Sequence, residues 1–205
     1  MKYVSALGVL ALALLLISAL AVIILVVKEP EISPVSVLEN VALSIMTASL
    51  TAAMFDILTQ SVEQRRWLAE RLRDLASSDA GFASRALDQL REQGLLESNV
   101  LCAKDLRRSN LSGLSLRNAH VEQSNLDNGR FIETDFRDAK LNGSSFRGSD
   151  LSRAQFSRTM LRGCDFREAV LDGAEFDNAD CTGAEFANAS LQNVNWNNCI
   201  GRPHD

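Results

Sequence analysis

The sequence predicts a membrane-anchored chain with two parts, an N-terminal α-helical transmembrane hairpin and a C-terminal all-β solenoid. Two observations support this fold class: two apolar stretches lie before residue 60, and every fifth residue from Leu101 to Trp196 is apolar. The chain has 205 residues, 46% of them hydrophobic, and a net charge of −5. We expect a first transmembrane helix at 1–28, a loop and a second transmembrane helix at 29–60, linker helices at 61–98, the solenoid at 99–200 and a tail at 201–205.

The first apolar stretch is long enough to cross a bilayer. Residues 4–27 contain no charged side chain, and as a helix they would measure about 36 Å against ~30 Å of hydrocarbon. A secretory signal peptide is the alternative, because Met1-Lys2 resembles its charged start and Ala19-Leu20-Ala21 resembles a cleavage site. Residues 22–27 continue the apolar run beyond that site, which favours an uncleaved helix.

The second apolar stretch, residues 37–58, is less hydrophobic. Its charges, Glu39 and Asp56, lie near its ends, where the membrane interface can hydrate them. Small residues recur in its middle at four-residue spacing, as in membrane helices that pack closely: Ser44, Ala48 and Ala52. We favour a second span over the alternative, an amphipathic helix that lies on the membrane or packs into the soluble part.

The positive charges orient this hairpin. Lys2 precedes the first span and Lys28 alone lies in the connecting segment. Four arginines follow the second span: Arg65, Arg66, Arg71 and Arg73. Because Lys and Arg are retained on the cytoplasmic side, both termini and the solenoid are expected in the cytoplasm. A single span would place the solenoid on the other side.

Two linker helices are expected before the solenoid. Residues 61–76 carry Leu68, Leu72 and Leu75 at helical spacing. Ser78 or Asp79 can cap a second helix that Gly94 can end. The apolar stripe of that helix consists of Phe82, Ala86, Leu87 and Leu90. We expect this stripe to cover the first coil of the solenoid and to shield its open edge.

The period of five in the C-terminal half fits neither a helix nor a strand. The residue two positions before each apolar residue is small at sixteen of twenty sites, and the residue between them is often Asp or Asn. A helix would spread these residues around its circumference, and a strand alternates every two residues. The pattern therefore predicts a solenoid in which each five-residue block forms one straight side, with its apolar and small residues facing inward.

Tandem blocks such as Ala169-Val170-Leu171-Asp172-Gly173 and Ala174-Glu175-Phe176-Asp177-Asn178 resemble the pentapeptide-repeat family. Residues 86–96 resemble the segment that leads into the repeats in membrane-anchored bacterial members. The resemblance implies a right-handed quadrilateral β-helix with four blocks per coil and about five coils. It also implies an inner (plasma) membrane protein of a bacterial cell.

A coil of four blocks places residues that are twenty apart on the same side. One side would stack Leu106, Leu126, Phe146, Phe166 and Phe186, and the facing side would stack Leu116, Phe136, Phe156, Phe176 and Trp196. The first coil departs from the pattern at Asn99, Lys104 and Leu114, so that end is expected to be covered. The last coil has no capping helix, which predicts a homodimer through the C-terminal coil; the alternative is that the last seven residues fold over it.

No catalytic, cofactor-binding or metal-binding residue is identified. His120 and His204 lie beside no cluster with ligand spacing, and the four cysteines contain no C-x-x-C pair: Cys102, Cys164, Cys181 and Cys199. Phosphate-binding, dinucleotide-binding, hydrolase and zinc-protease motifs do not occur in the sequence. The sequence therefore predicts a non-enzymatic protein without a cofactor or a small-molecule substrate.

Two functional hypotheses follow. The first is a membrane-tethered scaffold for an unidentified protein partner, and the second, implied by the resemblance, is an acidic β-helix that imitates DNA and binds a type II topoisomerase. Residues 101–205 contain thirteen Lys and Arg against fifteen Asp and Glu, whereas a duplex mimic needs a dense negative field. Arg107, Arg147 and Arg167 are expected along one side, and a single all-acidic patch is expected from Asp172, Glu175, Asp177, Asp180 and Glu185. The scaffold is favoured, and nucleic-acid binding is not expected.

The predicted orientation can be tested with a reporter fused to the C-terminus. A reporter that is active only in the cytoplasm should be active in this fusion, because two spans return the chain to its starting side. Activity of a reporter that works only outside the cytoplasm would contradict the hairpin and support a single span.

Overall fold

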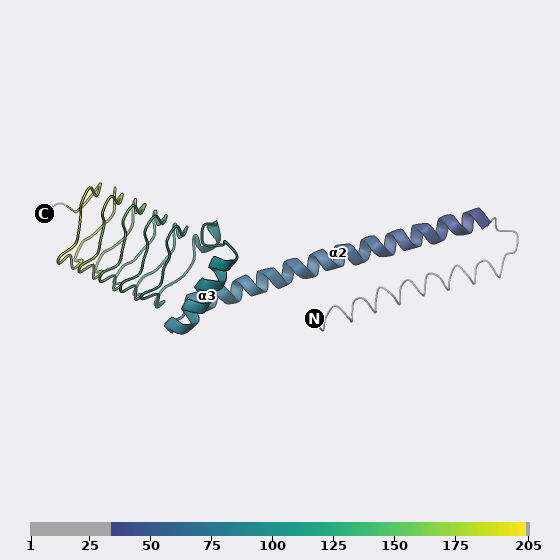
Figure 1. Ribbon diagram of the computed structural model, residues 1–205, viewed down its shortest axis with the longest axis horizontal. Helices are drawn as coiled ribbons and strands as arrows, with labels where there is room; N and C mark the ends of the chain where they lie inside the picture. Colours follow the sequence, from purple (N-terminus) through teal and green to yellow (C-terminus); the bar gives the residue numbers. More distant parts are fainter. Residues whose placement is uncertain (1–33, 204–205) are drawn as a thin grey trace. The chain divides into compact units, whose positions relative to one another are not determined.

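The computed structural model describes residues 34–203 (Figure 1). The expected first span at 1–28 lies outside the described residues, as do residues 29–33 and 204–205. The chain divides into two compact units, Met1–Arg66 and Trp67–Asp205.

Helix α2 runs over Pro34–Leu75 as one element of 42 residues. It joins the expected second span to the expected first linker helix, although the apolar and polar segments predict a boundary at residue 60. No break occurs there because no Gly or Pro interrupts residues 35–75. At 1.5 Å per residue the helix is about 63 Å long.

The first part of α2 presents an apolar surface. Large exposed apolar side chains line it: Val35, Leu38, Leu43, Ile45, Met46, Leu50, Met54, Phe55, Ile57, Leu58 and Val62. Hydroxyl groups on the same stretch donate to carbonyls one turn back, as Ser49 does to Ile45 (2.8 Å), so they need no water. With a mean hydropathy that reaches 1.8, α2 is the one helix among residues 34–203 that is long and apolar enough to cross a membrane.

Helix α3 spans Ala80–Glu92. The carboxylate of Asp79 caps it by accepting hydrogen bonds from the N–H groups of Gly81 (2.7 Å) and Phe82 (3.3 Å). Gly94, with a φ of 66°, follows its end, as expected for a residue that closes a helix in the left-handed region.

The buried stripe of α3 differs by one residue from the expected stripe. Ala83 is buried together with Ala86, Leu87 and Leu90, whereas Phe82 is 49% exposed. The prediction for Phe82 was wrong because residues 83, 86, 87 and 90 follow the i, i+3, i+4, i+7 spacing of one helix face, and residue 82 lies beside it. The Phe82 ring instead lies under the guanidinium of Arg85, 4.9 Å from its centroid.

The edge of the first coil is covered, as expected. The N–H of Asn110 donates to the carbonyl of Ser77 (3.0 Å), and the N–H of His120 donates to the carbonyl of Leu96 (2.8 Å). A short 3₁₀ turn, η1 (Asn99–Leu101), then leads into the coil. The segment before the repeats therefore satisfies backbone groups that an open edge would leave unpaired.

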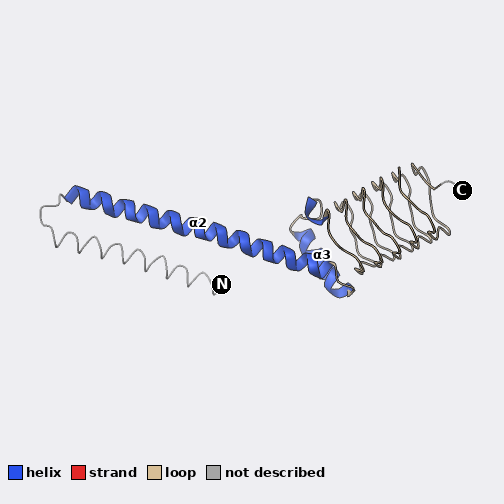
Figure 2. Cartoon of the chain, turned by 180° about the vertical axis from the view of Figure 1, so that it is seen from behind, coloured by secondary structure: helices blue, strands red, loops and turns tan. Residues whose placement is uncertain are grey.

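Residues 105–200 wind in coils of twenty residues, stacked one on the next (Figure 2). Parallel bridges join residues twenty apart, from Asp105 and Asn125 to Asp180 and Ile200. Each bridge stands alone, and no continuous strand forms between residues 34 and 203, because the chain turns after every block. The expected period of four blocks is confirmed, but the expected strands are reduced to single bridges.

The turns lie two residues after each central apolar residue. Every residue at this position has a positive φ, from Ala103 (54°) to Asn198 (52°). Gly and Asn adopt this conformation readily, but the series also contains Arg153 and Glu168. For such residues the left-handed conformation costs about 1–2 kcal/mol each, which the packing of neighbouring coils must offset.

Two columns of aromatic rings fill the interior. Phe136 and Phe156 stack with centroids 5.1 Å apart, and Phe146 and Phe166 stack at 5.3 Å. The columns meet edge to face, as between Phe146 and Phe156 at 6.3 Å and 82°. The columns expected from residues twenty apart are therefore confirmed, and each ring pair adds about 0.5–1.5 kcal/mol beyond the area it buries.

From residue 186 onward, the last coil is not covered by any described residue. Within residues 34–203, the N–H groups of Phe186, Leu191 and Trp196 and the carbonyls of Ala184 and Ala189 have no hydrogen-bond partner. Residues 186–200 also carry no charged side chain. This end of the solenoid is an open, uncharged edge.

A tight contact between Gly129 and Phe131 gives a test of the interior packing. A Cβ on Gly129 would lie 2.5 Å from Cζ of Phe131. We expect Gly129→Ala to lower the free energy of unfolding by about 1–3 kcal/mol, as overpacking does. When Phe131 is already replaced by Leu, the further change Gly129→Ala should lower the free energy of unfolding much less.

The stability of four full-length proteins is compared by thermal unfolding in detergent: the unsubstituted chain, the two single variants and the double variant. If Gly129→Ala costs the same in the Phe131→Leu background as in the unsubstituted chain, the ring contact is not the reason for glycine at this site.

Candidate functional site

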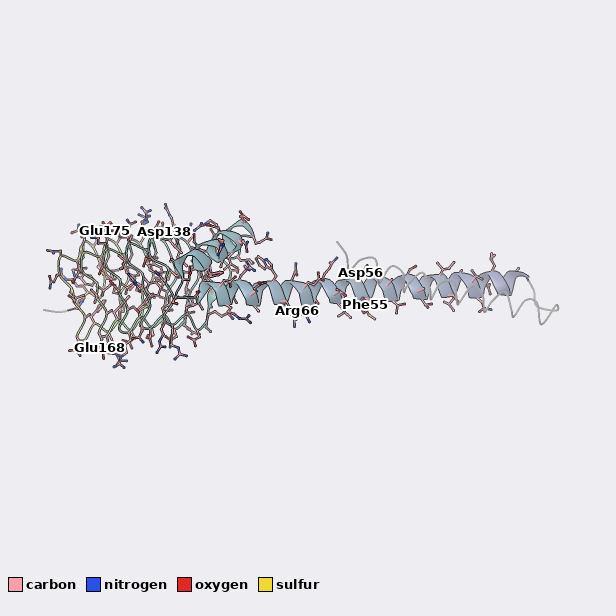
Figure 3. All side chains as sticks on the ribbon, turned by 90° about the horizontal axis from the view of Figure 1, so that it is seen from below. Phe55, Asp56, Arg66, Asp138, Glu168 and Glu175 are labelled. Atoms are coloured by element: carbon pink, nitrogen blue, oxygen red, sulfur yellow. The ribbon has the colours of Figure 1, made fainter. Side chains whose placement is uncertain are left out.

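The outer wall of the coils is the candidate functional surface. Two opposite sides carry most of the ion pairs. We call them the Phe136 side (115–118, 135–138, 155–158, 175–178 and 195–198) and the Phe146 side (105–108, 125–128, 145–148, 165–168 and 185–188). Figure 3 shows Asp138 and Glu175 on the first side and Glu168 on the other, while Phe55, Asp56 and Arg66 project from α2.

On the Phe136 side, Arg137 binds Asp135 with two parallel hydrogen bonds. Its Nε and Nη2 lie 2.9 and 2.8 Å from the two carboxylate oxygens. This hydrogen bonding is the main cause that lowers the pKa of Asp135 below its ordinary value. The Asp135 side chain is 18% exposed and that of Arg137 40%, so the guanidinium faces the solvent above its carboxylate.

Asp138 ties three coils together on the same side. One carboxylate oxygen lies 2.6 Å from Nε of Arg158, and the other lies 3.0 Å from Nη2 of Arg117. The hydrogen bond from Arg158 is the main cause that lowers the pKa of Asp138. Both arginines are held in fixed positions at the surface.

On the Phe146 side the three expected arginines do stack, and each is paired. The ion pairs join Arg107 to Asp105 (2.7 Å), Arg147 to Glu168 (2.6 Å) and Arg167 to Asp165 (2.6 Å). The hydrogen bond from Arg107 lowers the pKa of Asp105 to about 2. Because each guanidinium is matched by a carboxylate, this side carries no free positive ladder.

The expected all-acidic patch does not form. Bridges place Glu175 beside Gln155, Asp180 beside Met160 and Glu185 beside Asp165, on three different sides of the coil. Asp180 is paired with Arg162 (2.6 Å) and Glu185 with Arg167 (3.3 Å). The prediction was wrong because residues five apart in this sequence turn onto successive sides.

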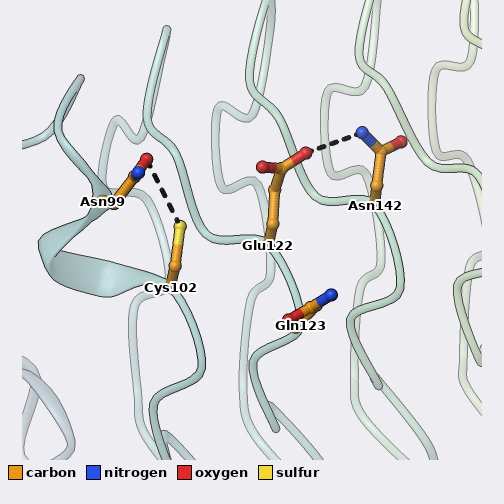
Figure 4. A pocket seen from close by; sticks show the side chains of 5 residues that line it. All are labelled: Asn99, Cys102, Glu122, Gln123 and Asn142. Atoms are coloured by element: carbon orange, nitrogen blue, oxygen red, sulfur yellow. Dashed lines mark hydrogen bonds between the residues drawn. The ribbon is translucent and has the colours of Figure 1, made fainter.

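The wall has shallow polar depressions. One, of about 290 Å³, is lined by Asn99, Cys102, Glu122, Gln123 and Asn142 (Figure 4). There the side-chain amide of Asn142 donates to the carboxylate of Glu122 (2.7 Å), and the Cys102 thiol lies 3.9 Å from the amide oxygen of Asn99. No basic group stands beside Cys102 in this lining to activate it as a nucleophile.

A second, larger depression has the same character. It measures about 520 Å³ and is lined by Glu133, Arg153, Gln155, Gly173 and Glu175. Arg153 and Glu133 form an ion pair at 3.2 Å across it. Such linings can hydrogen-bond to a partner surface, but they do not assemble a nucleophile, a base and an oxyanion site.

The histidines and cysteines singled out in the sequence are scattered. His120 lies near the covered edge, and His204 lies outside the described residues. Cys164 and Cys181 are buried and Cys199 is half-buried, as their inward positions predict. Between residues 34 and 203, no group of three His, Cys, Asp or Glu side chains is placed to hold a metal ion.

One close pair was missed by the sequence analysis. The sulfur atoms of Cys181 and Cys199 lie 3.4 Å apart. The separation of eighteen residues, two less than one coil, was the signal that could have revealed it.

Comparison with known proteins identifies the repeats. The family profile described as pentapeptide repeats (8 copies) matches residues 105–143, 115–153, 130–167 and 149–180. A search of curated proteins finds no significant match.

Solved structures are similar to part of the chain. A pentapeptide repeat protein from the Arabidopsis thaliana thylakoid lumen is 32% identical, and the match covers 47% of this chain and 63% of that one with a TM-score of 0.28. Rfr23 from the cyanobacterium Cyanothece 51142 is 15% identical (48% and 88% covered, TM-score 0.28). Full-length QnrB1, a plasmid-mediated fluoroquinolone resistance protein, is 27% identical (44% and 47% covered, TM-score 0.28). The chain spans less than two thirds of the first and third of these proteins, and none of the three likenesses bears on what it binds.

The ion pair of Asp135 predicts how stability depends on pH. Because its folded pKa is lowered, the stabilising contribution is present above the unfolded value of about 3.9 and is lost as the pH falls through the folded value. Arg137→Gln should therefore lower the melting temperature at neutral pH and reduce the further loss between neutral pH and about pH 2.

Melting curves of the full-length chain over this pH range check the prediction. Arg130→Gln is the matched control, since Arg130 is exposed and has no ion pair among the described residues. If the melting temperatures of Arg137→Gln and the unsubstituted chain fall by the same amount over this pH range, the ion pair of Asp135 is not the cause of the pH dependence.

Proposed function

Because this chain is a pentapeptide-repeat protein, we propose that it is a non-enzymatic, membrane-tethered scaffold that binds a protein partner through the wall of its coils. In this proposal α2 is the second of two spans in the cytoplasmic membrane of a bacterial cell, and the coils lie in the cytoplasm. The observation that carries the proposal is a polar wall of fixed ion pairs around an interior filled by side chains.

The apolar surface of α2 supports the tether. Eleven large apolar side chains between Val35 and Val62 are exposed, far more than a helix facing water would carry. The hydroxyls of this stretch bond to the helix's own carbonyls, as Thr59 does to Phe55 (2.9 Å). Burial in lipid accounts for both features, and Arg65 and Arg66 would then lie at the cytoplasmic interface.

The fixed arginines of the wall support binding to a protein. Arg117 and Arg158 share the carboxylate of Asp138 and lose little side-chain entropy when they meet a partner. Positive and negative groups alternate here, which favours a partner with a mixed polar surface over a strongly charged polymer. The duplex-mimic alternative has less support, since the acidic residues lie on different sides and several are paired with arginine.

The open last coil supports self-association as part of the same function. Unpaired N–H and carbonyl groups along an uncharged edge can pair with the same edge of a second copy without charge repulsion. A dimer of this kind would present two copies of the wall to partners.

Site-specific photo-crosslinking in intact cells tests both parts of the proposal. A photoreactive residue in place of Ser157, on the wall, should capture a protein other than this chain. The same residue in place of Asn197, on the last coil, should capture a second copy. At Leu50 on α2 it serves as the control, where capture of the wall partner is not expected.

The outcomes separate the two parts. Recovery of nothing but self-adducts from position 157 would contradict the scaffold. Absence of self-adducts at position 197 would contradict the dimer and leave the scaffold standing.

A further inference from the structure

The two thiols of Cys181 and Cys199 lie in contact at the open end of the solenoid. Their sulfur atoms are 3.4 Å apart. The two residues belong to neighbouring coils, since Cys181 occupies a central position and Cys199 the small position almost one coil later. They are the closest pair among the four cysteines, all of which are free.

Backbone hydrogen bonds hold the pair in place. The N–H of Cys181 donates to the carbonyl of Ile200 (2.8 Å), and the N–H of Ile200 donates to the carbonyl of Ala179 (3.0 Å). The residue after Cys199 is thus bridged to the residue before Cys181. Side-chain rotation, without a change in register, is the movement that would bring the sulfurs to bonding distance.

The two thiols differ in access and acidity. Cys181 is fully buried and Cys199 is half-buried, with no further coil above it among the described residues. The contact between the two thiols lowers the pKa of Cys199, while the same contact and burial raise the pKa of Cys181. The exposed member of the pair is therefore the one that ionises first, as a reactive thiol requires.

The other two cysteines lack this combination. The Cys164 thiol donates to the carbonyl of Leu141 (3.0 Å), and burial raises its pKa to about 12. Cys102 lies in the first coil, and its nearest polar contacts are the oxygens of His120 (3.6 Å) and Asn99 (3.9 Å). Neither has a second thiol in contact.

We propose that Cys181 and Cys199 are a redox-active dithiol that hydroperoxides oxidise to an intrachain disulfide, which clamps the last coil. The Cys199 thiolate attacks a peroxide oxygen, the O–O bond breaks, and protonation of the leaving oxygen releases water or an alcohol, leaving Cys199 as a sulfenic acid. The Cys181 sulfur then attacks the Cys199 sulfur and loses its proton, and the S–O bond breaks with release of water. Two thiols are oxidised by two electrons and one peroxide is reduced.

The disulfide would change the end of the fold that is open. The segment around Ile200, which is 63% exposed, is held to the coil below by backbone hydrogen bonds and by the side-chain amide of Asn198, which donates to Asn178 (3.3 Å). A covalent link at this place restricts the unfolding of the last coil. Thiol reductants of the cytoplasm would reverse it, so the state of the pair follows the redox state of the compartment.

The experiment uses the full-length chain, purified in detergent under reducing conditions and then exposed to hydrogen peroxide. Unreacted thiols are alkylated, and non-reducing peptide mapping by mass spectrometry locates the bonds. We expect a peptide pair joined through Cys181 and Cys199, lighter by two hydrogens and released by dithiothreitol. The melting temperature should rise on oxidation.

Two variants serve as matched controls. Cys199→Ser should lose both the joined peptide and the rise in melting temperature, whereas Cys102→Ser should keep both. Recovery of all four thiols after peroxide, a sulfinic acid on Cys199 beside a free Cys181, or a disulfide through Cys102 in place of this pair would overturn the proposal. The mapping of the unsubstituted chain decides the matter even if a variant folds poorly.

Discussion

The bridge between residues twenty apart is the interaction on which the rest of the solenoid depends. Each bridge fixes one residue of a coil above its counterpart in the coil below, as Asp135 is fixed between Ser115 and Gln155. Side chains that are twenty residues apart therefore lie above one another in columns. Inside the coil, the columns join ring to ring, and outside they bring carboxylates beside guanidiniums. Because every coil contacts only its neighbours, a change in one block is felt in its own coil and in the coils above and below.

The interior of the coils is packed with side chains, so the wall and the two ends carry the accessible polar groups. The aromatic columns stack ring on ring inside the coils, and the two depressions described on the wall are lined by polar residues, apart from Cys102 and Gly173. The lowered carboxylate pKa values are caused by hydrogen bonds at the surface, from Arg158 at Asp138 and from Thr182 at Asp180, while burial acts in the opposite direction. In enzymes such shifts gather around a reacting group. Here they follow the arginine–carboxylate pairs along the wall.

The sequence predicted the features that follow directly from the repeat period, and it failed where contacts between different blocks decide the structure. The aromatic columns were predictable because residues twenty apart must stack once the period is known. The continuity of α2 was not, since apolar and polar segments suggested a boundary where no helix-breaking residue stands. The acidic patch failed because reading along the chain ignored the turn between blocks. The same neglect hid the Cys181–Cys199 contact, which follows from adding eighteen residues in a coil of twenty.

The two ends of the solenoid differ in how the backbone N–H and carbonyl groups of the terminal coil are paired. At the first coil, Ser77 and Leu96 supply carbonyls to backbone N–H groups, and the buried stripe of α3 extends the hydrophobic core beyond the repeats. At the last coil the described residues supply nothing comparable, although the repeat pattern continues to Trp196. An open strand edge is a place where backbone groups can pair with another chain. In the proposed dimer, a second copy would complete the hydrogen bonds of this edge. In the proposed disulfide, a bond between Cys181 and Cys199 would fix its final segment. Both would act on the same few residues, so assembly and redox state could influence each other at this end.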